Sequence, residues 1–272
     1  MPHPMNSPSS FLVLQITDTH LFADEEAVMA GMQTVKAFRT VMEQVAQLPQ
    51  RPDLVLLTGD LSQDETVGSY QRLRDAINAL GIPAYVIPGN HDVPAVMNPI
   101  LQNGQFVTAR SLQKHNWNLI LLDSVIAGET AGRLAESELA FLDEQLSAYP
   151  EFPALVTLHH PPCLINSTWM DNIGLLNAEE FFAVLDRHPQ VKLVIFGHIH
   201  QEFEGERNGV RYLGSPSACV QFKPRTENFT LDQTLPGFRL LTLHPGGSFD
   251  TTIERVPFEG AVLKLIASRE MV

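Results

Sequence analysis

Five apolar stretches of this chain each end in side chains that bind metal ions in proteins. Residues 54–57 lead through Thr58 and Gly59 to Asp60. The other four stretches end at Asp18-Thr19-His20, Gly89-Asn90-His91-Asp92, His159-His160 and Gly197-His198-Ile199-His200. Because open α/β sheets place ligands beyond the carboxyl ends of their strands, this pattern predicts several strand ends that meet in one crevice.

The first half of the chain alternates between the apolar spacings of strands and helices. The elements that we expect are strands at 11–16, 54–57 and 84–87 and helices at 32–48 and 65–80. Pro49 and Gly81 should end the two helices. This β-α-β-α-β order predicts parallel strands joined by right-handed crossovers. Residues 93–112 are irregular, and we predict no element for them.

The second half continues in the same way until His200 and then changes. The elements that we expect before His200 are strands at 117–122, 155–158 and 191–196, helices at 136–148 and 177–187, and a loop at 161–176. The later helix should begin in a capping box, Asn177-Ala178-Glu179-Glu180. The later β-type runs are 209–213, 218–222, 238–243 and 251–256, the last two as a hairpin. We infer from these runs an antiparallel second sheet packed on the first, with helices outside.

The composition is that of a globular protein with a large core, since 44% of the 272 residues are hydrophobic and 18% are charged. We expect one domain at 11–260, a disordered tail at 1–10 and a C-terminal extension at 261–272. The net charge of −13 argues against nucleic acid as a partner. No apolar run is long enough to span a membrane, so we expect no membrane association. The two cysteines, Cys163 and Cys219, suggest a reducing compartment, and we expect a cytoplasmic protein.

The candidate metal ligands are mixed in kind. They are the carboxylates Asp18 and Asp60, the amide oxygen of Asn90, and the imidazoles His20, His159, His198 and His200. Mixed oxygen and nitrogen ligands suit two divalent transition-metal ions, and we expect iron or manganese, with zinc as the alternative. Asp60 is interpreted as a carboxylate that both ions share. In an extended segment residues two apart face the same way, so His198 and His200 could each serve a different ion.

Each motif is weak by itself, because histidines are often satisfied core or surface groups. We interpret four histidines in that way: His3, His115, His188 and His244. The other six of the ten histidines all lie at predicted strand ends. Purely structural roles do not predict such crowding. The combination therefore indicates a dinuclear metal hydrolase that acts on a phosphate ester.

Together the motifs resemble those of the calcineurin-like metallophosphoesterases over about residues 11–200. The chain is more similar still to the bacterial class III 3′,5′-cyclic-AMP phosphodiesterases. The stretches that carry this closer likeness are 14–22, 197–202, 219–224 and 228–232, which extend the resemblance to about residue 256. The resemblance implies an α/β fold, a four-layer α-β-β-α sandwich of two mixed sheets.

The resemblance also implies a role for each candidate residue. One ion would be held by Asp18, His20, Asp60 and His200, and the second by Asp60, Asn90, His159 and His198. His91 would be no ligand; it would contact the phosphate and protonate the leaving oxygen, so that His91 and Asp60 are the catalytic residues. Substrate contacts are implied for His20, Asp60, Asn90, His91 and His200.

The roles of three further residues near these motifs are less defined. Strand alternation should turn His160 away from the site. Asp92 is interpreted either as a carboxylate that orients a ligand or as a residue that stabilises the turn. Trp169, in the 161–176 loop, could stack on a nucleobase, although a tryptophan packed in the core is the commoner case.

The function that we predict is metal-dependent hydrolysis of 3′,5′-cyclic AMP to 5′-AMP. A hydroxide bridging the two ions would attack phosphorus in line, with His91 as the general acid. The partner would be this small cyclic nucleotide, and a homodimer is left open. One alternative is the same chemistry on another phosphodiester, such as a 2′,3′-cyclic nucleotide, or on a phosphomonoester. The other is a binding scaffold without turnover, against which the complete ligand set speaks.

Overall fold

The structure, a computed structural model, describes residues 10–258; residues 1–9 of the predicted tail and the predicted extension at 261–272 lie outside them. The helices are α1 Thr34–Ala46, α2 Val67–Leu80, α3 Pro94–Leu101, α4 Glu136–Ala148, α5 Thr168–Asp171 and α6 Ala178–Leu185. The strands are β1 Phe11–Ile16, β2 Leu54–Thr58, β3 Ala84–Ile87, β4 Phe106–Val107, β5 Ser111–Lys114, β6 Trp117–Leu121, β7 Ala154–Thr157, β8 Val191–Phe196, β9 Phe203–Arg207, β10 Val210–Gly214, β11 Gln221–Phe222, β12 Leu231–Asp232, β13 Gly237–Leu243 and β14 Phe249–Arg255.

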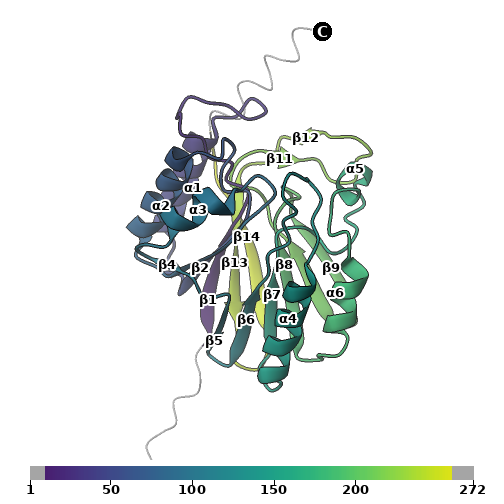
Figure 1. The fold of residues 1–272 in the computed structure, drawn as a ribbon. Coiled ribbons are helices and arrows are strands. Elements are labelled where there is room, and N and C mark those ends of the chain that lie inside the picture. Colours follow the sequence, from purple (N-terminus) through teal and green to yellow (C-terminus); the bar gives the residue numbers. More distant parts are fainter. Residues whose placement is uncertain (1–9, 259–272) are drawn as a thin grey trace, which may run out of the picture.

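Two six-stranded sheets form the centre of the molecule, with α1, α2 and α3 on one side and α4 and α6 on the other (Figure 1). The first sheet has the order β14-β13-β1-β2-β3-β4. Its strands β1, β2 and β3 are parallel, as the β-α-β-α-β pattern predicts. Ile16 pairs with Leu57, and Thr58 pairs with Ile87, so the three strands end almost level.

The second sheet differs from the prediction that its strands come from the C-terminal part and are antiparallel. Its order is β5-β6-β7-β8-β10-β9, and β6, β7, β8 and β10 are parallel to one another. The predicted hairpin, β13 and β14, exists but extends the first sheet, where β13 runs antiparallel to β1. Short β-type runs fit either sheet edge, so their pattern alone could not assign them. Both sheets are mixed, and the four-layer α-β-β-α sandwich is confirmed.

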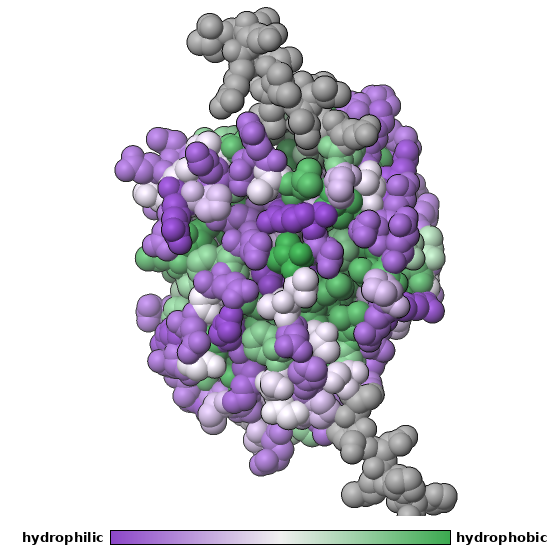
Figure 2. Space-filling model, turned by 180° about the vertical axis from the view of Figure 1, so that it is seen from behind, coloured by the Kyte–Doolittle hydropathy of each residue, from purple (hydrophilic) through white to green (hydrophobic). Residues whose placement is uncertain are grey.

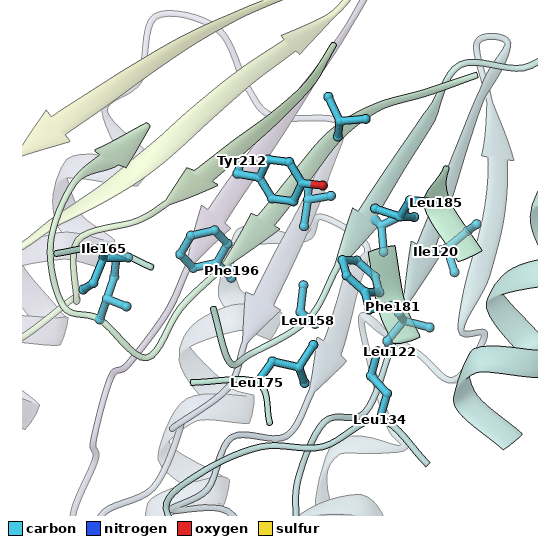
Figure 3. Close-up of a cluster of buried hydrophobic side chains, with 14 of the residues drawn as sticks. Ile120, Leu122, Leu134, Leu158, Ile165, Leu175, Phe181, Leu185, Phe196 and Tyr212 are labelled. Atoms are coloured by element: carbon cyan, nitrogen blue, oxygen red, sulfur yellow. The ribbon is translucent and has the colours of Figure 1, made fainter. Parts of the chain in front are cut away.

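Alternate residues of the central strands face two different apolar layers. In β8, Leu193 and Ile195 pack between the two sheets, whereas Val194 and Phe196 face the helices. The continuous apolar runs of these strands follow from this arrangement, because both faces of each sheet are covered. Figure 3 shows the outer layer of the second sheet, where Phe181 and Leu185 of α6 lie among strand residues such as Ile120.

The helix ends follow local rules at some places and tertiary contacts at others. The helix α2 is preceded by the N-cap Thr66, whose hydroxyl accepts from the Ser69 amide, and followed by the C-cap Gly81 with φ 63°. The predicted capping box at Asn177 is wrong. Asn177 precedes α6, but its side chain does not cap the helix; it bonds to the backbone of Leu134 at 3.0 and 2.9 Å.

Three segments differ from the prediction: two contain helices or strands that the sequence does not predict, and one predicted strand is shorter. The irregular residues 93–112 contain α3 and β4 and begin β5. The predicted loop 161–176 contains the short helix α5. Of the predicted strand 218–222, only Gln221–Phe222 is extended, and it pairs with β12 as a small ribbon. Figure 1 shows this ribbon beyond the ends of the main strands, near α5.

The surface seen from behind mixes hydrophilic and hydrophobic residues, with the hydrophilic ones gathered mainly around the rim (Figure 2). Within residues 10–258, every helix is too short or too polar to cross a bilayer. The single domain expected at 11–260 stays a prediction. A homodimer stays an open alternative.

The layer between the sheets should carry much of the stability. Leu193 is fully buried there, and Leu193→Ala should lower the free energy of unfolding by about 2–5 kcal/mol, because the lost contacts leave a cavity. Chemical denaturation followed by circular dichroism measures the change. The matched control is Leu164→Ala, a leucine that is 71% exposed, which should change it by less than about 0.5 kcal/mol. Equal effects of the two substitutions would contradict this assignment of the core.

Candidate metal centre

The ends of five strands from the two sheets meet at one end of the sandwich. The turn after β1 contacts the turn after β2, since the Asp18 amide donates to the Gly59 carbonyl at 3.0 Å. The turn after β8 contacts the same place, where the His198 amide donates to both carboxylate oxygens of Asp18 at 3.1 Å. His159, at the end of β7, reaches the Thr58 carbonyl with its ring. The residues that follow these strands therefore meet at one place, as the strand-end motifs predict.

The backbone at this place is left-handed at five candidate ligands. Asp18, His20, Asp60, His198 and His200 all have φ between 43° and 68°. This region is uncommon for residues other than glycine, and each such residue costs roughly 1–2 kcal/mol. The extended conformation predicted for His198 and His200 is therefore wrong. Both rings still lie in the site, since Nε2 of His200 is 3.4 Å from Oδ1 of Asp18 and the ring centroid of His198 is 5.1 Å from that of His159.

Two glycines let the turns approach one another closely. A Cβ atom on Gly89 would lie 2.2 Å from Oδ1 of Asp60, and one on Gly197 would lie 2.1 Å from Oγ1 of Thr17. Any side chain at either position would displace a candidate ligand or its support.

The first group of candidate ligands consists of four fully buried residues. Their ligating atoms all lie within 4.8 Å of one another: Asp18, His20, Asp60 and His200. Nε2 of His200 is 3.4 Å from Oδ1 of Asp18, and Nε2 of His20 is 3.6 Å from Oδ2 of Asp60. This is the set that the sequence resemblance implies for the first ion.

Hydrogen bonds fix which ring nitrogen of this group is free. Nδ1 of His200 lies 2.8 Å from the Val220 carbonyl, and Nδ1 of His20 lies 2.8 Å from Oε1 of Gln63. Both partners are acceptors, so both Nδ1 atoms carry the proton and both Nε2 atoms present lone pairs. The two Nε2 atoms are 3.1 Å apart. Two lone pairs facing each other beside two carboxylates fit a cation between them.

The second group shares Asp60 with the first. Nε2 of His159 is 3.4 Å from Oδ1 of Asp60 and 3.3 Å from Oδ1 of Asn90. Nδ1 of His159 lies 2.7 Å from the Thr58 carbonyl, which leaves Nε2 as the free nitrogen. Nε2 of His198 is buried with no hydrogen-bond partner among the described residues. An orphaned imidazole nitrogen at this place fits a metal ligand better than a structural group.

The pKa values of the two ligand groups follow from burial and from the charge of Asp60, which both groups contact. Burial opposes ionisation of Asp60, but His159 and His20 outweigh it and hold the pKa of its carboxyl well below the usual range. Burial also opposes charge on His159, yet Asp60 raises the pKa of that imidazole to about 9. Burial lowers the pKa of His20 to about 4. The site therefore keeps negative carboxylates beside His20 and His198, whose rings burial keeps neutral, while the raised pKa of His159 shows that the carboxylates attract positive charge to this place.

His160 lies closer to the site than predicted. Its ring centroid is 4.9 Å from that of His159 and 4.8 Å from that of His198. The ring nitrogens of His159, His160 and His198 are close enough to one another to hold an ion. However, Nε2 of His160 lies 3.2 Å from the Thr130 carbonyl and Nδ1 lies 2.8 Å from the Ser124 hydroxyl. With both nitrogens engaged, His160 is better described as packing behind the ligands.

His91 and Asp92 follow β3 and differ in exposure. The His91 amide donates to Oδ1 of Asp60 at 2.8 Å, and its half-buried ring lies 5.0 Å from that of His20, edge to face. Asp92 is buried and accepts from the backbone amides of Leu61, Ser62 and Gly89. These are the contacts of a residue that stabilises turns, the second of the two interpretations made from the sequence.

Sequence reasoning missed the groups that orient the ligands. Gln63 holds His20, the carbonyls of Thr58 and Val220 hold His159 and His200, and the Thr17 hydroxyl donates to Oδ2 of Asp18 at 2.7 Å. A signal existed for Gln63, which follows Asp60 by three residues in the same turn. Carbonyl groups carry no such signal, because every residue has one.

A two-sheet sandwich with two adjoining groups of candidate ligands around one aspartate is the arrangement expected of a metallophosphoesterase. The family model for calcineurin-like phosphoesterases matches residues 11–202, and the chain belongs to that family. It is 47% identical to a 3′,5′-cyclic-nucleotide phosphodiesterase of Nostoc sp., over 93% of this chain and 96% of that protein. It is 41% identical to the 3′,5′-cyclic adenosine monophosphate phosphodiesterase CpdA of Vibrio vulnificus, over 92% of each chain, and 39% identical to CpdA of Escherichia coli K12, over 93% and 92%.

Solved structures share the fold at low sequence identity. A dimetal phosphatase from Danio rerio superposes with a TM-score of 0.65 at 14% identity, over 92% of this chain and all of that one. GAP50, the anchor in the inner membrane complex of Plasmodium, superposes with a TM-score of 0.62 at 12% identity, over 92% and 90%. One is named as a phosphatase and the other as an anchor, so the fold by itself does not assign an activity.

Removing Asp60 should affect metal binding more than removing Asp18. Asp60 adjoins both ligand groups, whereas Asp18 adjoins His200 in the first group. After reconstitution and gel filtration, Asp60→Ala should hold almost no metal, and Asp18→Ala should keep about one ion per chain. Plasma mass spectrometry of the purified proteins measures the content. Two ions bound to Asp60→Ala would contradict a shared carboxylate.

Proposed function

We propose that this protein hydrolyses 3′,5′-cyclic AMP to 5′-AMP. The observation that carries the proposal is the complete pair of ligand groups joined by Asp60, in a chain about as long as the similar phosphodiesterases. The names of those relatives, CpdA of Vibrio vulnificus and of Escherichia coli, support 3′,5′-cyclic AMP as the substrate.

The residues fit two divalent ions. Asp18, His20, Asp60 and His200 would hold the first, and Asp60, Asn90, His159 and His198 the second. When bound, such ions lower the pKa of water towards neutrality and neutralise charge on the phosphoryl oxygens. The mixed oxygen and nitrogen set favours iron or manganese, with zinc as the alternative.

The chain's own groups would position the substrate and supply the proton. His20, Asn90 and His200 would contact the phosphate, together with Asp60. The ring of His91 is more exposed than the ligand rings, and its backbone is held against Asp60, so it can face a bound diester. As a general acid it would donate to the departing 3′ oxygen, which leaves as a hydroxyl group.

The proposal includes the location and the partner. The acidic chain would act on a small nucleotide in the cytoplasm, without nucleic acid as a partner.

A broader substrate range is favoured by one observation, because the Nostoc relative is named for cyclic nucleotides in general. The test is kcat/KM of the metal-loaded protein for 3′,5′-cyclic AMP, 3′,5′-cyclic GMP, 2′,3′-cyclic AMP and a phosphomonoester. A preference for any substrate other than 3′,5′-cyclic AMP would reject the proposal in its specific form.

Replacing His91 should separate proton donation from metal binding. His91→Ala should lower kcat for 3′,5′-cyclic AMP by about 10²–10⁴-fold, because the leaving oxygen would depart without a proton donor. Its metal content should equal that of the unchanged protein, measured on the same samples. The loss should be smaller for a diester with a nitrophenolate leaving group, which needs no proton. If metal is lost along with activity, His91 is not the general acid.

A further inference from the structure

A continuous set of aromatic rings runs from the metal centre towards the surface. The ring of His200 stacks on Phe222, with centroids 4.0 Å apart and an interplanar angle of 11°. Phe222 contacts Phe229 at 5.2 Å and Trp169 at 5.3 Å, and Trp169 contacts Phe229 at 5.3 Å. We call Trp169, Phe222 and Phe229 the aromatic cluster. It begins at a candidate ligand, so it belongs to the surroundings of the site.

The cluster ends at an exposed ring. Phe222 is buried, Trp169 is partly buried, and Phe229 is 56% exposed. Phe229 packs on Trp169 and Phe222 but leaves more than half of its surface open to solvent, so a planar ligand could contact the open part of the ring. Figure 1 shows that the ribbon that carries these residues, β11 and β12, lies beyond the ends of the site-bearing strands.

The loop between β11 and β12 is held by specific hydrogen bonds. The Lys223 amide donates to the Thr230 carbonyl at 2.8 Å, and the Arg225 amide donates to the Ser167 hydroxyl at 2.9 Å. Nε1 of Trp169 donates to the Thr226 hydroxyl at 3.3 Å. These bonds join the loop to the segment around α5. Phe229 is therefore presented on a fixed support.

We infer that Phe229, supported by Trp169 and Phe222, forms a stacking subsite for the nucleobase of the substrate. The inference rests on the proposed function, because it places a nucleotide's phosphate at the metal centre. Two ring contacts separate His200 from Phe229, and a sugar ring separates the phosphate of a nucleotide from its base. Aromatic side chains bind every base through its π-face, so the subsite favours nucleotides over simple diesters without selecting one base.

The charge of the same loop agrees with an anionic ligand. Lys223 and Arg225 are both exposed. With Glu227 in the same loop, residues 223–230 have a net charge of +1 in a chain of net charge −13, so this loop repels a phosphate less than the chain as a whole does. Trp169, which the sequence suggested as a stacking residue, instead supports Phe229 from the protein side.

The test measures binding without turnover. The dissociation constants of 5′-AMP and ribose 5-phosphate are determined by calorimetry on metal-loaded protein. Phe229→Ala should weaken 5′-AMP binding about tenfold, within the range for loss of one base stack, and leave ribose 5-phosphate within about twofold. Phe229→Trp should restore affinity for 5′-AMP, whereas Phe229→Leu, which keeps apolar bulk without a ring, should not. The matched control is Val67→Ala, an exposed apolar residue of α2, which should change neither constant.

The outcomes separate this inference from the proposed function. Equal 5′-AMP affinity in the unchanged protein and Phe229→Ala would overturn the subsite. That result would be expected if the base lay in the cavity between α3 and β6, which Met97 and Asp123 line. Recovery of affinity in Phe229→Leu would also overturn it, since stacking would not be the cause. If Phe229 controls 5′-AMP binding but 3′,5′-cyclic AMP is not hydrolysed, the subsite stands and the proposed function fails.

Discussion

The carboxylate of Asp60 is the interaction on which the rest of the site depends. Its oxygens lie 3.6 Å from Nε2 of His20 and 3.4 Å from Nε2 of His159, and Oδ1 also accepts the amide of His91. One side chain thus joins both ligand groups and the turn that carries the candidate acid. A buried carboxylate is costly unless it is paired, and here the pairing groups are imidazoles and, by proposal, cations.

The two sheets must keep a fixed relation for these groups to meet. A buried polar network lies directly beneath the site, where Nε2 of Gln15 donates to the Thr58 hydroxyl at 3.0 Å and to the Phe196 carbonyl at 3.2 Å. The Ser215 hydroxyl donates to Gln15 and accepts from the buried Arg239. This network joins β1 and β2 of the first sheet to β8 of the second. Because buried polar groups need their partners, it specifies how far one sheet can slide over the other.

The strained turns and the glycines serve the same geometry. Left-handed residues at Asp18, Asp60 and His198 would be unfavourable in isolation, and they persist because the surrounding hydrogen bonds hold them. Gly89 and Gly197 remove the side chains that would separate the turns. The aromatic cluster extends this fixed arrangement outward. Phe222 stacks on the face of the His200 ring, while the Val220 carbonyl accepts a hydrogen bond from Nδ1 at the edge of the same ring. Rigid placement of both phosphate and base would follow from one set of contacts.

The sequence by itself determined which residues could bind metal and at which strand ends they lie. Apolar runs ending at Asp18, Asp60 and His159 identify the strands, because both faces of those strands are buried and the polar residues must then serve the site. Only the tertiary structure decided which sheet receives β10 and β13, that His160 is engaged elsewhere, and which nitrogen of each ring is free. Strand pattern is a local property, whereas pairing partners and carbonyl acceptors are supplied by segments distant in the chain, and no local pattern records them.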